Sequence, residues 1–423
     1  MASNSKNIAE LLNTDTTIAV GDVADGSITT AKLADDAVTT AKVAADAVTA
    51  AELADDSVVT ANIVDGNVTA VKTTGVGKGK NLLINGGMLV DQRNATMQFN
   101  ASSGYPCDRW YVGTYAIGTF QYTQSTDAPA GFGNSMKIQC TTADTSLDAG
   151  SYNYIMHKLE GNALQSMNST NGIVQHTISF YAKSSKTGVY TVNLRDEDNA
   201  QGNSKTFTIS TADTWERYTV TFPAHSSGTL DNDNLSSYRI YWWMASGSNQ
   251  TSGTFYNGTW GAHSNPNRVS SSNVNLGDNT SNNFLITGIQ METGNLATDF
   301  EHRSFGEELS LCQRYYVRMT DNTSQSAIAY GRGAGGGQNV VSAAPVPVPM
   351  RASPTITSTG AYHASDHNSR TSFTPTSVIA SGFNKYSSNL GLYFSAGTTV
   401  CDDDRVTLVG GNGATTLEIS AEL

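Results

Sequence analysis

The sequence predicts a mostly β chain in three parts: an N-terminal repeat shaft, a β-sandwich and a small C-terminal β domain. All Phe, Trp and Tyr residues lie at or after Phe99, and a ten-residue pattern repeats through residues 18–67. Short segments in which apolar and polar residues alternate come after this repeat. Because aromatic side chains supply much of a globular core, the part before Phe99 is expected to differ physically from the rest.

Residues 18–67 consist of five ten-residue units such as ITTAKLADDA and VTTAKVAADA. The first position of each unit is β-branched and the sixth is aliphatic, and such fixed-period repeats indicate stacked architectures. Each unit has too few apolar side chains to offset the entropy of ordering it within one chain. We therefore expect a homotrimer, in which parallel chains bring their apolar stripes to a common axis and form a shaft over residues 18–74.

The repeat sequence fits more than one conformation and more than one role for its aspartates. Its backbone is either partly helical or extended, and an acidic disordered linker is the alternative to a shaft, because Ala, Thr and Asp bury little apolar surface. The repeat has nine acidic residues and two lysines, which is more than half of the net charge of −12. A calcium ladder is conceivable, but a solvated acidic face is favoured because calcium repeats combine Asp with denser Gly.

Residues 75–303 alternate apolar and polar side chains in segments separated by Gly, Asn, Asp, Ser and Thr clusters, with no long helical period between them. This pattern predicts antiparallel strands in a sandwich or jelly roll. The expected strands cover residues 109–115, 120–123, 136–140, 176–181, 189–194, 206–209, 217–222, 238–244 and 284–289.

Residues 304–423 indicate a C-terminal β tip domain with a short helical connector. The glycine-rich stretch 331–337 is expected to be an exposed loop or flexible connection, because it lacks the Gly-Lys-Ser/Thr of a phosphate loop. The proline-alternating segment 344–350 is not expected in a central strand, because proline has no N–H for the ladder.

Four β segments have recognisable sequences: NLLINGGM at 81–88, TISFYAKS at 177–184, TWERYTVTFP at 214–223 and FLITGIQMETGNLATDFEH at 284–302. Together they resemble a jelly-roll carbohydrate-binding module of the kind found in phage tail fibres. The decapeptide array resembles the shaft repeats of tail fibres from marine podophages. Trp110 and Trp215 lie in the module-like segments and are expected in the core.

The resemblance implies a viral tail fibre in the virion, assembled in the host cytoplasm. Residues 1–17 would attach to phage tail or adaptor proteins, the shaft would extend outward, and the β domains would bind a bacterial surface glycan or protein during host adsorption. No cofactor and no catalysis are implied. A polysaccharide-degrading tailspike enzyme is the alternative. A bacterial surface adhesin is opposed by the lack of a secretory apolar core near the N-terminus.

Charge and hydropathy exclude two further partner classes. The net charge of −12 opposes nucleic acid as a partner, because phosphate binding needs a basic face. No run of residues has the length and hydropathy of a membrane span, so no membrane insertion is expected.

No sequence pattern predicts a catalytic or metal site. The four cysteines form no close pair, so buried free thiols are favoured over zinc ligands or a bridge between Cys107 and Cys140. His363 and His367 lie in a turn-prone loop. The acidic clusters 196–198 and 402–404 could hydrolyse a glycosidic bond as paired carboxylates, but turns between strands are the favoured explanation.

Aromatic residues carry the binding hypothesis, because their rings pack on the apolar faces of sugars while polar side chains bond the hydroxyls. In the expected strand 238–244, one face has Tyr238, Ile240 and Trp242, and the other has Arg239, Tyr241 and Trp243. We expect the face with the arginine to be exposed and to bind ligand, because burying an unpaired guanidinium is costly.

The loop 255–267 supplies two further ligand-binding candidates, Tyr256 and Trp260, which lie among turn residues. A tryptophan in a Gly- and Asn-rich loop is hard to explain as core. Trp260 is therefore the best single candidate, with a structural plug as the alternative.

Overall fold

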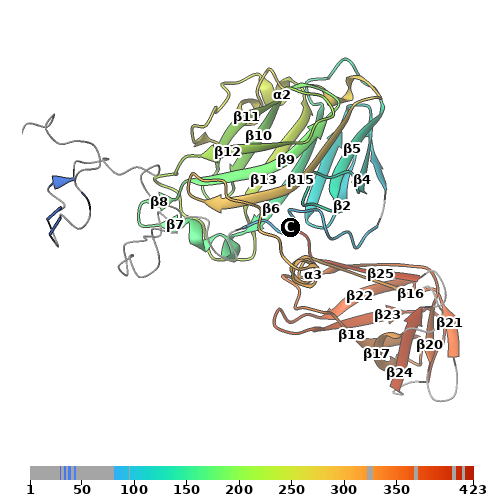
Figure 1. The fold of residues 1–423 in the computed structure, drawn as a ribbon. Helices are drawn as coiled ribbons and strands as arrows, with labels where there is room; N and C mark the ends of the chain where they lie inside the picture. The colour runs from blue at the N-terminus through green and yellow to red at the C-terminus, as the bar shows by residue number, and fades with distance from the viewer. Residues whose placement is uncertain are drawn as a thin grey trace, which may run out of the picture. The chain divides into compact units, whose positions relative to one another are not determined.

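The computed structural model describes residues 29, 33–34, 37–39, 42–43, 81–94, 96–321, 327–365, 370–402, 406–411 and 415–423. The chain divides into two compact units, Met1–Lys72 and Thr73–Leu423. The predicted attachment peptide 1–17 and almost all of the shaft 18–74 lie outside the described residues. All described strands belong to the second unit (Figure 1).

Two antiparallel sheets form a β-sandwich, coloured blue to yellow in Figure 1. The six-stranded sheet has the order β1-β4-β5-β15-β9-β12, and the seven-stranded sheet has the order β14-β11-β10-β13-β6-β3-β2. The chain crosses repeatedly between the sheets, as in a jelly roll. The first sheet comprises β1 (Met97–Phe99), β4 (Thr119–Ser125), β5 (Ser135–Thr142), β9 (His176–Ser184), β12 (Glu216–Phe222) and β15 (Asn283–Thr293). The second comprises β2 (Ser103–Cys107), β3 (Trp110–Tyr115), β6 (Tyr152–Glu160), β10 (Gly188–Asp196), β11 (Gln201–Ile209), β13 (Ser236–Ser246) and β14 (Gly261–Ala262).

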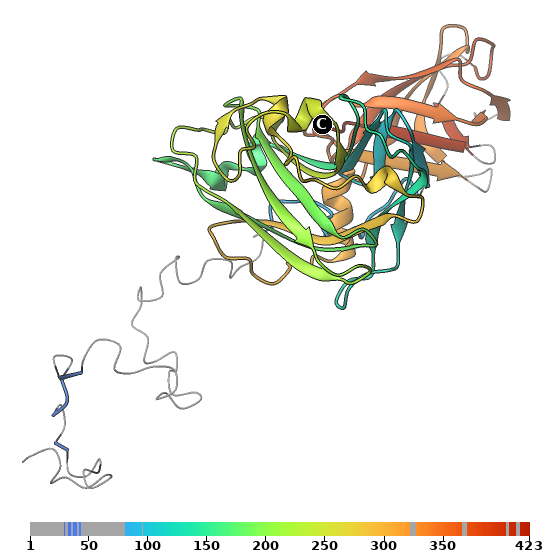
Figure 2. The same ribbon diagram turned by 90° about the horizontal axis from the view of Figure 1, so that it is seen from above.

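Short elements occupy the connections between these strands (Figure 2). They are η5 (Gly161–Ala163), η6 (Gln165–Met167), α2 (Ser248–Thr251), η7 (Asn265–Asn267), η8 (Leu276–Asp278) and the ribbon of β7 (Asn168–Ser169) and β8 (Gly172–Ile173). Both α2 and η7 come before Arg268 and Val269 in the chain, and these two residues cover the outer side of β13.

The hydrophobic core lies between the two sheets and is formed by alternate residues of each strand. On β13 the inward residues are Tyr238, Ile240 and Trp242, as the alternation predicts. Trp110 of β3 packs edge-on against Trp242 at 5.7 Å between ring centroids and donates its indole hydrogen bond to Asn85 O at 2.8 Å. A buried indole with a satisfied N–H contributes a large apolar area without leaving a polar group unpaired.

The nine predicted strand segments all lie within strands of the sandwich, except that Arg109 precedes β3 by one residue. Strand β6, which lies between β13 and β3 in the seven-stranded sheet, is a strand that the sequence analysis did not identify. The prediction of a mostly β sandwich is confirmed.

Trp215 is not part of the core, and that expectation is wrong. It lies just before β12, where Val220 and Phe222 face inward and residues of odd number point outward. Its ring is partly exposed, and its indole donates a 3.0 Å hydrogen bond to Asp127 Oδ1. Lys183 Nζ lies 5.4 Å from the centre of the same ring.

A second β domain follows helix α3 (Phe305–Gln313). Ser304 and Glu307 form a capping box at the start of this helix, which satisfies two backbone N–H groups. The domain has its own hydrophobic cluster and two sheets, of order β16-β25-β19 and β21-β20-β24-β17-β18-β23-β22. Its strands are β16 (Tyr316–Asp321), β17 (Ala327–Ala334), β18 (Asn339–Pro345), β19 (Thr355–Thr359), β20 (Tyr362–Ser365), β21 (Arg370–Phe373), β22 (Ser377–Gly382), β23 (Asn389–Ser395), β24 (Val406–Gly411) and β25 (Thr415–Ser420).

The glycine-rich stretch 331–337 is a loop only in its second half, so the prediction is wrong for the first half. Gly331 and Gly333 lie within β17, where a Cβ would come within 2.0 Å of Val341 O and 2.2 Å of Asp402 O, respectively. Glycine thus allows neighbouring backbone to approach this strand closely. The proline-alternating segment begins where β18 ends, and Pro345 pairs on one side only, with Asn389 of β23.

The four cysteines are buried free thiols, as predicted. No helix among the described residues is long and apolar enough to cross a bilayer. The same residues contain no group of three or more His, Cys, Asp or Glu side chains that could hold a metal ion, and His367 lies outside them.

Buried ion pairs hold the sandwich and the C-terminal β domain together. Arg109 Nη1 contacts Glu422 Oε2 at 2.5 Å, and its guanidinium lies 3.5 Å from the ring centre of Tyr315. Glu160, the last residue of β6, contacts Arg314 Nη2 at 2.8 Å and Arg351 Nε at 3.4 Å. Breaking one partner of such a pair would leave a buried charge uncompensated, so these contacts favour one arrangement of the two domains.

Candidate functional site

The outer face of the seven-stranded sheet carries a continuous surface of aromatic side chains. Directly opposite residues in an antiparallel pair point to the same side of a sheet. The register places Trp243 of β13 opposite Tyr154 of β6, and Tyr152 of β6 opposite Tyr115 of β3. The aromatic face, as we define it, consists of Tyr105, Tyr111, Tyr115, Tyr152, Tyr154, Tyr241 and Trp243.

Tyr154 lies at the centre of the aromatic face. Its ring centroid is 5.2 Å from those of both Tyr241 and Trp243. On the other side it is 5.4 Å from that of Tyr152 and 6.5 Å from that of Tyr111. These separations are those of favourable aromatic pairs, so the rings support one another in a fixed arrangement.

Gly113 of β3 makes room for the ring of Tyr154. The two residues are opposite each other in the register, and a Cβ at Gly113 would lie 2.5 Å from Tyr154 Cζ. Beyond this point Tyr115 stacks on Tyr152 with 5.7 Å between centroids and 25° between ring planes. The face therefore continues as a nearly flat ring platform across β3 and β6.

Exposure changes along the aromatic face. Tyr115 is 51% exposed, and the two tyrosines of β6 are half-buried. Tyr241 and Trp243 on β13 are only 4% and 1% exposed. The rings of β3 and β6 are therefore the ones that a ligand can reach.

The prediction that Tyr241 and Trp243 are exposed is wrong, because the segment after η7 crosses β13 on its outer side. The guanidinium of Arg268 lies 4.4 Å from the ring centre of Tyr241 and 4.8 Å from that of Trp243. Arg268 Nε donates to Asn193 Oδ1 at 3.0 Å, and Val269 packs against the same rings. The cation–π contacts and the hydrogen bond offset the cost of burying this guanidinium.

Arg239 lies on the outer face, as the alternation predicts, and is paired. Its Nε is 2.7 Å from Glu197 Oε1, and Arg195 Nη2 is 3.0 Å from Glu197 Oε2. Both arginine side chains are 31% exposed and Glu197 is 17% exposed. Two guanidinium groups share one carboxylate, so this edge of the sheet presents polar groups beside the rings.

Lys158 lies opposite Arg239 in the register and connects this charged edge to the aromatic face. Its Nζ is 5.5 Å from the ring centre of Tyr111. Burial, together with the positive charges of Arg239 and Arg109, lowers the pKa of Lys158 to about 8. The amino group donates one hydrogen bond to Leu423 O and has further N–H groups at the border of the ring platform.

Tyr256 is 8% exposed and holds its own loop together. Its hydroxyl donates to Ala262 O at 2.8 Å and accepts a 2.7 Å hydrogen bond from Ser264 N. Gly202 is in close contact with the ring, since a Cβ there would lie 2.8 Å from Tyr256 Cε2. Little of this ring is accessible to a ligand, contrary to the expectation of an available loop aromatic.

Trp260 is half-buried and anchored. Its indole donates to Pro223 O at 2.8 Å, and its ring stacks on His225 with centroids 5.1 Å apart. It packs against the main core and lines an opening of about 500 Å³ together with Gln201 and His225. Its ring neighbours do not belong to the aromatic face, so the predicted binding residues fall into two separate groups.

The acidic cluster 196–198 stabilises a turn. Asp196 is fully buried and accepts hydrogen bonds from the backbone N and Nδ2 of Asn199 at 3.1 and 2.8 Å. Burial raises the pKa of this carboxyl, and the hydrogen bonds from Asn199 oppose the rise. Glu197 is held by its two arginines. In the other acidic cluster, residues 403 and 404 lie outside the described residues.

The sequence analysis missed the tyrosines that contribute most of the reachable surface. Tyr152 and Tyr154 belong to β6, and Tyr111 and Tyr115 lie on β3 without having been singled out. The signal was present: in YNYIMHKLE the residues at 152, 154, 156 and 158 alternate with buried ones such as Ile155. A period of two through a tyrosine pair indicates a half-buried strand.

Comparisons with known proteins give structural likenesses only. No protein-family model matches the chain, and no curated protein matches it. The enzymatically active domain of tailspike protein 4 from bacteriophage CBA120 aligns with 51% of this chain and 22% of its own, at 14% identity and a TM-score of 0.27. The chain therefore spans about a fifth of that protein's length.

Two sugar-binding proteins align with the same share of this chain. TmCBM61 in complex with β-1,4-galactotriose is covered over 99% of its length, at 9% identity and a TM-score of 0.25. A putative sugar binding protein from Bacteroides thetaiotaomicron is covered completely, at 15% identity and a TM-score of 0.28.

Proposed function

We propose that the aromatic face binds a glycan of a bacterial cell surface. The observation that carries this proposal is the ring platform of β3 and β6, where Tyr115 is 51% exposed and stacks on the half-buried Tyr152. Exposed aromatic rings held in a fixed plane suit the flat, apolar C–H faces of sugar rings.

The polar groups around the platform suit the hydroxyls of the same ligand. Lys158 borders Tyr111, and Arg239 is held in place by Glu197. A few fixed donors and acceptors beside a mainly apolar surface give a binding site its orientation and specificity. The site binds sugar rings in an extended row, since the platform runs across two neighbouring strands.

We infer further that the chain acts as a homotrimeric phage tail fibre in the virion. The decapeptide repeat supports a trimeric shaft, and residues 1–17 would attach it to tail or adaptor proteins. Three glycan sites on one fibre raise the avidity through effective concentration, so that each site need bind only weakly. Adsorption to the host requires binding and no bond cleavage.

The proposal is tested with purified full-length protein and immobilised host surface polysaccharide. Replacing Tyr115 and Tyr152 together by Ala should weaken binding by about tenfold or more, because each stacked ring contributes about 0.5–1.5 kcal/mol beyond its buried area. Tyr330→Ala is the matched control, since Tyr330 is 58% exposed in the C-terminal β domain. Equal affinities for all three proteins would exclude the aromatic face.

The same preparation distinguishes a binder from a polysaccharide-degrading tailspike. Incubation with the polysaccharide should leave the concentration of reducing sugar ends unchanged. A steady release of oligosaccharide would establish cleavage and contradict the binding-only proposal.

A further inference from the structure

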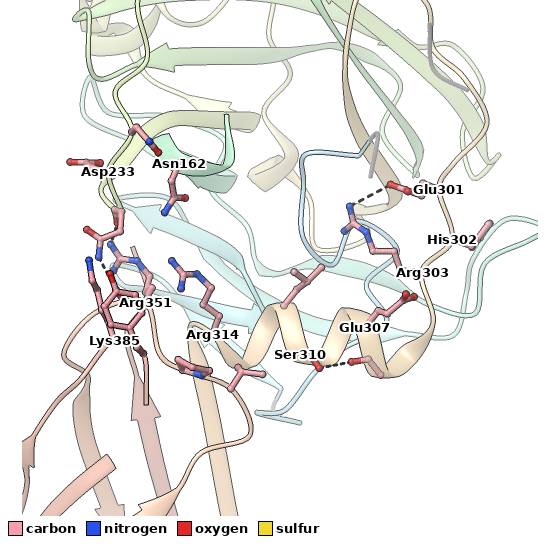
Figure 3. A pocket seen from close by; sticks show the side chains of 17 residues that line it. Asn162, Asp233, Glu301, His302, Arg303, Glu307, Ser310, Arg314, Arg351 and Lys385 are labelled. Carbon is pink, nitrogen blue, oxygen red and sulfur yellow. Dashed lines mark hydrogen bonds and ion pairs between the residues drawn. The ribbon is translucent and has the colours of Figure 1, made fainter. Parts of the chain in front are cut away.

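A second cavity, of about 1370 Å³, lies beside helix α3. Its wall combines residues of the sandwich, the outer side of α3 and two loops of the C-terminal β domain (Figure 3). This volume exceeds that of most pockets for small ligands, so it has room for more than one sugar unit. No residue of the aromatic face lines it.

Two arginines of the cavity wall share the buried carboxylate of Glu160. Arg314 and Arg351 both contact this carboxylate, at 2.8 and 3.4 Å. Arg351 Nη1 also donates to Ala421 O at 3.0 Å, and Asn234 Nδ2 donates to Arg351 O at 2.7 Å. Arg351 is only 7% exposed in its side chain, whereas Arg314 is 35% exposed and presents its guanidinium to the cavity.

The acidic side chains of the cavity wall accept hydrogen bonds from the protein itself. Glu307 accepts the hydrogen bonds of the α3 capping box, and Glu301 Oε2 accepts from Asn81 N at 2.9 Å. Asp233 Oδ1 accepts from Leu235 N at 2.7 Å. The basic residue Arg303 also has a partner within the protein, since its Nη1 donates to Leu83 O at 3.0 Å. These groups already have partners within the protein.

Two basic groups of the cavity, Lys385 and the exposed part of Arg314, are available to a ligand. Lys385 is exposed, and among the described residues it makes no hydrogen bond or ion pair. Its Nζ lies 5.1 Å from the ring centre of Tyr386. Figure 3 shows Lys385, Arg314 and Arg351 gathered at one end of the cavity with Asn162 near them. Asp233 lies beside Asn162 at the same end, so this end has three cations (Lys385, Arg314 and Arg351) and the carboxylates of Glu160 and Asp233. The excess of positive charge favours an anion.

Tyr386 gives this end an aromatic surface. It is 80% exposed, the highest exposed fraction among the large apolar side chains of the described residues. A turn in which Asn384 Oδ1 accepts from Tyr386 N at 2.9 Å fixes the backbone, and Val346 N donates to Ser388 O at 2.7 Å just beyond it. The ring therefore stands on an ordered loop at the cavity wall.

We propose that this cavity binds a carboxylate-bearing sugar unit of an acidic polysaccharide. The sugar ring packs on Tyr386, and its carboxylate is bound by Lys385 and the exposed part of Arg314. The exposed amides of Asn162 and Asn232 hydrogen-bond the hydroxyls. An inorganic anion would use the cations alone, whereas the ring and the amides fit a saccharide. The site is separate from the aromatic face and does not depend on it.

The proposal is tested by calorimetric titration of the full-length protein with trigalacturonic acid and with its methyl ester. The two probes have the same rings and differ in charge, so the acid should bind about tenfold more tightly than the ester. Lys385→Ala and Tyr386→Ala should each weaken binding of the acid by about three- to tenfold. Both residues are exposed, so the variants should retain the circular dichroism spectrum and unfolding midpoint of the wild type.

Three outcomes would overturn the proposal. They are equal affinity for acid and ester, unchanged affinity in the Lys385→Ala, Tyr386→Ala double variant, and binding of inorganic phosphate as tight as that of the acid. Tyr330→Ala is the control for an exposed tyrosine elsewhere in this domain and should bind the acid normally. Tyr152→Ala should also bind it normally, which separates this site from the aromatic face. The charge reversal Lys385→Glu should abolish the preference for the acid over the ester.

Discussion

Single residues show where local sequence patterns are sufficient and where they fail. Alternation along β13 correctly assigns Tyr238, Ile240 and Trp242 to the core. The same pattern cannot reveal that Trp243 is covered, because the covering side chain, Arg268, lies on another segment of the chain. Burial of an outward residue is a long-range property, and only the tertiary fold determines it.

His176 makes the stability of the sandwich depend on pH. It is the first residue of β9 and is fully buried, and burial lowers its pKa from 6.5 to about 4, against the opposing hydrogen bond to Val174 O. Below pH 6.5 the unfolded chain takes up a proton that the folded protein does not, so stability falls as the pH falls from 6.5 to about 4. The His176 contribution to this loss between pH 7 and pH 5 is about 2 kcal/mol.

The check is urea unfolding of the wild type and of His176→Gln at pH 7 and at pH 5. Loss of the stacking contact with Phe222 should destabilise the variant at both values, while the difference between them shrinks. If the variant kept the full pH dependence of the wild type, another group would be responsible.

At the scale of elements, the sequence identifies most of the long strands but not the one at the middle of the aromatic face. Nine predicted segments lie in strands, because turn residues separate them and β-branched or aromatic residues fill them. Strand β6 is harder to recognise, since Asn153, His157 and Lys158 interrupt its apolar residues. Asn153 is buried nonetheless, and its Nδ2 donates to Thr114 Oγ1 at 3.0 Å. From the sequence alone, a buried polar residue with a hydrogen-bond partner cannot be distinguished from an exposed one.

The contact between β3 and β6 predicts the effect of a single methyl group. Gly113→Ala would place a Cβ 2.5 Å from Tyr154 Cζ, so the ring must move. Overpacking of this kind costs about 1–3 kcal/mol, and the displaced ring should also weaken glycan binding. Urea unfolding and glycan titration measure the two effects.

Gly133→Ala is the matched control, because a Cβ there would have no heavy atom within 4 Å. This control should change neither quantity appreciably. Equal behaviour of the two variants would show that Tyr154 does not depend on the space at Gly113.

For the whole molecule, composition separates two kinds of sequence. The repeat 18–67 is acidic and has no aromatic residue, and the aromatic-bearing part forms two β domains, each with its own hydrophobic cluster. More than half of the net charge of −12 comes from the repeat, so the acidity of the chain says little about its ligand. The basic end of the cavity beside α3 illustrates this, since it is built within an acidic protein. Its residues come from distant segments, and no sequence motif could have brought them together.

The repeat predicts the state of the protein in solution. Light scattering of the full-length chain should give three times the mass of one chain, because the apolar positions of the repeat need neighbouring copies for burial. A protein that lacks residues 1–72 should have the mass of a single truncated chain. A monomeric full-length chain would contradict the trimeric shaft and leave the glycan sites without the avidity proposed for them.

The most direct test of the central claim is a structure of the full-length protein with an oligosaccharide from the host surface polysaccharide. We expect sugar rings to lie over Tyr115, Tyr152 and Tyr154, with hydroxyls bonded by Lys158 or Arg239. A neutral oligosaccharide is the appropriate probe, because the cavity beside α3 is proposed for acidic sugars. Ordered sugar elsewhere on the sandwich, with the rings of β3 and β6 left free, would contradict the account.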